Sequence, residues 1–104
     1  MLTQQNAIKL VKEYVNLCYK NNIYFTKIIL FGSFVSGNAN KDSDIDVLFV
    51  SDQFTDNTFE NWRTLSPITA KFYDIEPHPY PTDYFEKSDP FIEEIKKTGI
   101  EIKF

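Results

Sequence analysis

The sequence predicts an α/β protein with a small mixed β-sheet flanked by helices. Residues 3–19 have the helical period of an amphipathic helix. Two apolar runs, at residues 28–31 and 47–50, have the composition of buried strands. A polar, glycine-containing stretch separates the two runs, as expected for a loop. Because 104 residues suffice for one hydrophobic core but not for two, we expect one domain over residues 1–104.

The first helix is expected from Thr3 to about Tyr19. Thr3 is a suitable N-cap, and Asn21 a suitable stop. One face of this helix is apolar and consists of Ala7, Val11, Tyr14 and Cys18. We expect Cys18 to be a small buried hydrophobic residue and not a nucleophile.

Two central strands follow, with a polar connection between them. Residues 26–31 are expected to form the first strand, buried on both faces, and residues 45–50 the second, paired to the first. Between them we expect a short helical turn at residues 33–36 and a loop at residues 37–43.

In the second half of the chain the predicted helices and strands are interrupted by prolines. A helix from roughly Asn57 should break at Ser66-Pro67, and residues 68–76 have the alternation of a strand. Prolines at positions 77, 79 and 81 are expected to exclude regular structure. Residues 84–97 should form a helix broken near Asp89-Pro90, with Gly99 as its stop, and residues 100–104 a short edge strand.

Composition excludes several function classes. A net charge of −4 and the absence of a basic run argue against general binding to nucleic acid. No signal pattern and no apolar stretch of about 18 residues is present, so neither secretion nor a membrane span is expected. A single cysteine makes the cytoplasm the expected location. Ten Phe and six Tyr exceed what one small core requires, and an exposed aromatic patch would indicate a partner surface.

Asp44 and Asp46 are the candidate metal ligands. Side chains two residues apart on a strand project from the same face, so both carboxylates should point to one place. Two like charges this close are tolerated if a cation lies between them, and oxygen donors suit Mg²⁺ or Mn²⁺. The alternative is a polar strand start that caps the preceding loop.

Gly32 and Ser33 end the first strand and are the candidate phosphate-binding residues. A glycine there lets the backbone come close to a ligand, and a serine can cap a helical turn and also contact a phosphate. Ser33 could alternatively be only an N-cap. Beside a metal-binding acid pair, such a turn is suited to moving phosphoryl or nucleotidyl groups.

Gly32-Ser33, ten intervening residues and Asp44-Ile45-Asp46 resemble the GS-x(10)-D-x-D signature of the DNA polymerase β-type nucleotidyltransferase superfamily. The small size resembles its minimal nucleotidyltransferase branch. Residues 75–79 and 90–100 resemble the closing segments of such domains, so the likeness covers nearly the whole chain. The resemblance implies the nucleotidyltransferase fold.

The resemblance also implies a third carboxylate on a neighbouring strand. Asp74 and Glu76 both fit, and the likeness of residues 75–79 favours Glu76 as a catalytic residue and metal ligand. The family's usual basic residue after the glycine–serine pair is replaced by Ser36. Lys41 could supply the phosphate counter-charge, or it could be a solvated loop lysine. His78, between two prolines, is expected to be a structural residue.

The implied reaction is the Mg²⁺- or Mn²⁺-dependent transfer of a nucleotidyl group, AMP from ATP, onto an acceptor hydroxyl. Minimal nucleotidyltransferases are frequently antitoxins that adenylylate a tyrosine of a small helical HEPN-type toxin, and such a partner is therefore expected. One alternative is a nucleotide-binding or toxin-masking module without turnover. Another is a small-molecule nucleotidyltransferase of the aminoglycoside-modifying type.

Overall fold

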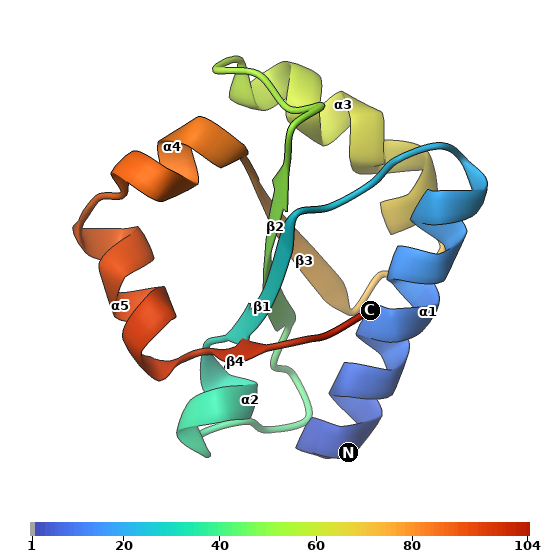
Figure 1. Cartoon of the computed structure of the whole chain (residues 1–104). Coiled ribbons are helices and arrows are strands. Elements are labelled where there is room, and N and C mark those ends of the chain that lie inside the picture. Colours follow the sequence, from blue (N-terminus) through green and yellow to red (C-terminus); the bar gives the residue numbers. More distant parts are fainter. Residues whose placement is uncertain (1) are drawn as a thin grey trace.

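A computed structural model describes residues 2–104 and places a four-stranded sheet between two layers of helices (Figure 1). The strands have the spatial order β3-β2-β1-β4, and they are β1 (Lys27–Phe31), β2 (Ile45–Ser51), β3 (Ile75–Pro81) and β4 (Ile100–Glu101). β1 is antiparallel to both of its neighbours, whereas β2 and β3 are parallel. The predicted mixed sheet and the predicted pairing of the two central strands are confirmed.

The helices divide between the two faces of the sheet. One face is covered by α1 (Gln4–Lys20) and α3 (Thr58–Thr69), and the other by α4 (Thr82–Lys87) and α5 (Pro90–Thr98). The short α2 (Ser33–Ser36) follows β1 at one end of the sheet (Figure 1). Among the described residues, no helix is both long enough and apolar enough to cross a membrane.

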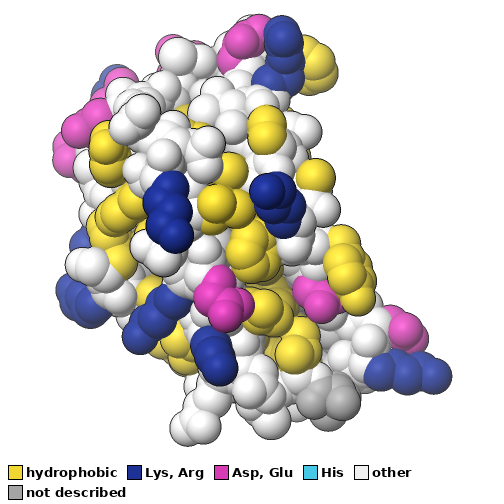
Figure 2. Space-filling view, turned by 90° about the vertical axis from the view of Figure 1, so that its right-hand side faces the viewer, with side chains coloured by type: hydrophobic (Ala, Val, Ile, Leu, Met, Phe, Trp, Pro, Cys, Tyr) yellow, Lys and Arg dark blue, Asp and Glu magenta, His cyan; other side chains and the backbone are white. Residues whose placement is uncertain are grey.

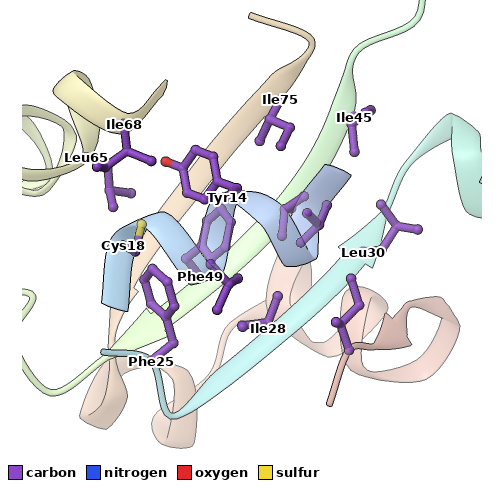
Figure 3. Packing of buried hydrophobic residues seen from close by; sticks show 14 of the residues in the cluster. Tyr14, Cys18, Phe25, Ile28, Leu30, Ile45, Phe49, Leu65, Ile68 and Ile75 are labelled. Atoms are coloured by element: carbon purple, nitrogen blue, oxygen red, sulfur yellow. The ribbon is translucent and has the colours of Figure 1, made fainter. Parts of the chain in front are cut away.

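The larger core lies between α1, α3 and the sheet. The ring of Tyr14 stacks on the ring of Phe49 with centroids 5.0 Å apart (Figure 3). The Tyr14 hydroxyl also shares a 2.8 Å hydrogen bond with the hydroxyl of Thr69 in α3, so the buried phenol keeps a polar partner. Cys18 is fully buried on the same face of α1, as predicted.

Local signals set the ends of the helices as expected. Thr3 caps α1 in a capping box with Asn6, and Asn21 is its C-cap. The break between α4 and α5 falls at the predicted place, because Asp89 accepts a hydrogen bond from the backbone N–H of Ile92 at 2.8 Å and so caps α5. β4 pairs at the edge of the sheet, as predicted, although only Ile100–Glu101 form the strand.

The predicted helix break at Ser66-Pro67 is wrong. Helix α3 continues through Pro67 to Thr69. Proline removes one helical hydrogen bond, but Leu65 and Ile68 on either side of it are buried in the core. Burial of each of these side chains stabilises the fold by roughly 1.5–3 kcal/mol, and the two together offset the lost hydrogen bond.

The predicted strand at residues 68–76 and the predicted irregular stretch after it are also wrong. The strand is β3, and it contains all three prolines. β3 is an edge strand, and successive backbone N–H groups of a strand point to opposite sides. The carbonyl of Asp74 accepts a bond from the N–H of Ile45 at 2.7 Å, so the even-numbered residues face β2. The backbone nitrogens of the prolines, which are at odd positions, therefore point away from β2, so the missing N–H groups cost no hydrogen bond of the sheet.

The buried thiol predicts a loss of stability at alkaline pH. Burial raises the pKa of Cys18 to about 12, whereas a thiol in an unfolded chain ionises near 8.5. Above about pH 9 the unfolded chain releases this proton and the folded chain keeps it, so the free energy of unfolding should fall by roughly 1 kcal/mol per pH unit. Urea unfolding at stepped pH should show a shallower fall for Cys18→Ala, and equal slopes for both proteins would contradict this.

Candidate functional site

Three ligand-bearing side chains meet where β2 and β3 run side by side. The parallel register pairs Asp46 with Glu76 and Leu48 with His78. Because residues two apart share a strand face, Glu76 and His78 both point to the side on which Asp46 lies. One carboxylate oxygen from each acid and one ring nitrogen of His78 all lie within 4.8 Å of one another. Such a group of oxygen and nitrogen donors can hold a divalent cation.

His78 contacts Asp46 on one side and aromatic rings on the other. Its Nε2 atom lies 3.2 Å from Oδ1 of Asp46, and each of the two side chains is 26% exposed. The imidazole packs edge-on against the ring of Phe31, with centroids 5.0 Å apart, and lies 6.2 Å from the ring of Phe91. These contacts leave the nitrogen facing the carboxylate.

Gly32 is required by the position of Asp46. Its φ of +81° and ψ of −151° belong to a region that glycine alone adopts readily. A Cβ atom built on Gly32 would lie 2.5 Å from Oδ2 of Asp46, so the Asp46 side chain would have to shift to make room for it. The turn after β1 therefore places the Gly32 backbone against the Asp46 carboxylate. The sequence led us to expect a ligand close to this glycine, and in the structure the Asp46 side chain is the group that lies there.

The site carries an excess of negative charge. Desolvation, and next the charge of the Asp46 carboxylate, raises the pKa of Glu76, while His78 acts in the opposite direction. Asp44 contributes a smaller increase. A divalent cation between these groups would relieve the repulsion, so the donor set fits the metal that the sequence led us to expect.

The other predicted residues lie outside this group of ligand atoms. Asp44 is exposed immediately before β2, and it does not belong to the group of ligand atoms within 4.8 Å. Asp74 lies in the turn before β3, also outside that group, and its backbone carbonyl pairs with β2. Ser33 is half-buried at the start of α2, and Lys41 is exposed in the loop before Asp44. The roles of all four remain predictions.

From the sequence, His78 was expected to be a structural residue, whereas the structure places its ring nitrogen with the carboxylates of Asp46 and Glu76. The residue lies two positions after Glu76, which is the spacing of a shared strand face. This spacing carried no weight in the sequence, because the prolines around His78 predicted an irregular segment and not a strand.

A cavity of about 480 Å³ adjoins the site on the side of α5. Its walls come from the end of β1, from α2 and from α5, and they include Phe31, Gly32, Phe91 and Glu94. The cavity thus offers aromatic and acidic groups directly beside the Gly32 turn.

Residues 11–103 match the family described as the nucleotidyltransferase domain. The chain belongs to this family. The match confirms the family expected from the motif that runs from Gly32 to Asp46.

This nucleotidyltransferase domain is similar to one curated protein in sequence and to a solved structure in fold. A Methanocaldococcus jannaschii protein named putative protein adenylyltransferase is 46% identical over 50 residues, covering 45% of this chain and 48% of that protein. The chain therefore matches about half the length of this curated relative. A solved nucleotidyltransferase structure from Sulfolobus solfataricus, itself described as putative, superposes with a TM-score of 0.70 at 23% identity, covering 94% of this chain and 80% of that one.

Two further structural neighbours of the nucleotidyltransferase domain come from toxin–antitoxin complexes. One is a toxin–antitoxin structure with AMP-PNP, with a TM-score of 0.61 at 17% identity, covering 92% of this chain and 72% of that chain. The other is the complex of a tri-AMPylated Shewanella oneidensis HEPN toxin with an MNT antitoxin, with a TM-score of 0.56 at 16% identity, covering 97% and 72%. At these identities the likeness establishes the fold.

The Gly32 turn gives a test of the metal site. Gly32→Ala should lower the affinity for Mn²⁺ by about tenfold or more, because the new Cβ displaces Asp46. Gly37→Ala is the control, since Gly37 also has a positive φ, of +87°, but has open space around it. Titration of Mn²⁺ followed by electron paramagnetic resonance would measure both affinities. An equal loss in the two variants would show that a general effect of replacing a glycine in this region, and not the position of Asp46, is responsible.

Proposed function

We propose that this domain transfers AMP from ATP to a hydroxyl group of a partner protein, with the help of a divalent cation. The observation that carries the proposal is the meeting of Asp46 and Glu76 on paired strands against the Gly32 turn. The family membership supports nucleotidyl transfer as the reaction class.

Asp46 and Glu76 are the proposed metal ligands, and Asp44 is a further candidate two residues before Asp46. Their carboxylates supply the oxygen donors that Mg²⁺ and Mn²⁺ accept. A cation bound there would neutralise triphosphate charge and stabilise the charge that develops at the reacting phosphorus.

The nucleotide is proposed to lie between the Gly32 turn and α5. Gly32 and Ser33 would contact the β- and γ-phosphates, and Lys41 would reach them from the loop as a counter-charge. The nucleoside would then enter the cavity of about 480 Å³ that adjoins Gly32. Phe91, which is 43% exposed at this cavity, offers a ring for stacking on a base.

Glu76 is the proposed general base, with Asp74 as the alternative. In this reaction the acceptor oxygen attacks the α-phosphorus, its proton passes to the carboxylate, and pyrophosphate leaves. Glu76 is exposed beside Asp46, so an acceptor hydroxyl can reach it.

The proposed acceptor is a tyrosine of a small helical HEPN-type toxin, which would make this chain an antitoxin. Support comes from the fold neighbours, one of which is an MNT antitoxin with a tri-AMPylated HEPN toxin, and from the relative named as an adenylyltransferase. The surface is also suited to a partner. Phe59 is 68% exposed and Tyr73 88% exposed. Figure 2 shows further hydrophobic side chains lying between Lys and Arg side chains on the side where α1 lies.

A second candidate is a masking module that binds the toxin without modifying it. Ser36 favours this candidate, because the family usually has a basic residue in the turn after the glycine–serine pair. The geometry of Asp46 and Glu76 favours turnover.

The first test compares carboxylate variants in a transfer assay with labelled ATP and Mg²⁺ or Mn²⁺. Asp46→Asn and Glu76→Gln should each lower the rate by roughly a hundredfold or more, since each removes charge at the reacting centre. Asp74→Asn should stay within about threefold, because Asp74 lies outside the ligand group. Full activity of Asp46→Asn would refute the proposal, and a large loss in Asp74→Asn alone would exchange the roles of Asp74 and Glu76.

The second test identifies the acceptor. The chain is co-expressed with a small helical protein encoded in the neighbouring reading frame, and the mass of that protein is measured. We expect one or more added AMP groups on a tyrosine, and none with Asp46→Asn. A partner that binds tightly but keeps its unmodified mass would support the masking module.

A further inference from the structure

We infer that His78 is itself a ligand of the cation and that its imidazole makes the site prefer Mn²⁺ or Co²⁺ over Mg²⁺. The inference rests on the proposed function, because it concerns the same site. It adds a nitrogen ligand to the expected carboxylates, and it specifies which divalent cations the site binds best.

The spacing of the donor atoms suits shared coordination. Two ligand atoms bound at right angles to one ion, each at about 2.1 Å, lie about 3.0 Å apart. Nε2 of His78 and Oδ1 of Asp46 lie 3.2 Å apart. A carboxylate oxygen of Glu76 lies within 4.8 Å of a ring nitrogen of His78 and of a carboxylate oxygen of Asp46. A small contraction of the side chains is therefore enough to bring all three onto one ion.

His78 is held rigidly in this position. It lies on β3 opposite Leu48 of β2, so its Cα position is fixed by the sheet. The following proline restricts His78 to extended backbone conformations, and the contact with Phe31 limits rotation of the ring. A ligand fixed in this way loses little conformational freedom on binding.

The chemistry of the donor set decides the class of ion. Mg²⁺ binds oxygen donors and gives up water reluctantly, whereas imidazole nitrogen is a good ligand for transition metals. Two carboxylates with one imidazole therefore favour Mn²⁺ or Co²⁺. The competing interpretation is that the His78 ring only donates a hydrogen bond to Asp46, which would orient the carboxylate without selecting among ions.

The chain makes a direct test possible, because His78 is its only histidine. Pulsed electron paramagnetic resonance on the untagged chain with Mn²⁺ detects a directly bound ring nitrogen, and any such signal must come from His78. We expect the nitrogen modulation in the wild-type chain and its loss in His78→Gln. The wild-type spectrum is informative even if the variant folds poorly.

Affinities supply a second readout. His78→Gln should lower the affinity for Mn²⁺ by about tenfold or more, while the affinity for Mg²⁺, measured by competition, should change by less than about threefold. Asp52→Asn is the matched control, since this exposed acid lies beyond the opposite end of β2, and it should change neither affinity.

The outcomes separate the two proposals. Mn²⁺ that binds without nitrogen modulation, or equal losses of Mn²⁺ and Mg²⁺ affinity in His78→Gln, would overturn the role of His78 and leave the proposed function intact. Failure of the wild-type chain to bind either ion, with Asp46→Asn no different, would overturn both.

Discussion

The in-register pairing of β2 with β3 is the constraint on which the site depends. It places Asp46 beside Glu76 and brings His78 onto the same face, although these residues are about thirty positions apart in the chain. The core beneath holds this register, because Ile45, Val47 and Phe49 alternate with Asp46 and point to the opposite, buried face. A shift of one residue would turn Asp46 into the core, so packing and site geometry are fixed by the same contacts.

The turn at Gly32 is the second fixed element. Its backbone conformation is unfavourable for other residues, and the space that a side chain would need is filled by Asp46. Strain of this kind persists only when surrounding structure enforces it. Here the buried Leu30 before the turn and the buried Phe34 after it anchor both sides of the glycine.

Features with local causes were predictable from the sequence. The period of α1, its Thr3 cap and the two apolar strands all appear as expected, because the residues that cause them are neighbours in the chain. Gly32, Asp46 and Glu76 were also named in advance, through motif spacing and family resemblance. Pro67 inside α3 and the prolines of β3 were misread, because their tolerance depends on core packing and on an edge position that only the assembled sheet defines. The position of His78 beside the two acids was not predicted for the same reason.

The prolines of β3 have a consequence for how the molecule meets its neighbours. The backbone nitrogens that face outward along this strand belong to Ile75 and to the three prolines. The N–H of Ile75 already bonds to the carbonyl of Phe72 at 2.9 Å, and the prolines have no N–H. An incoming strand would find no donors there, so sheet extension from chain to chain, the usual route to β-aggregation, is blocked at this border. A protein that binds along this border must instead recognise side chains or carbonyl groups.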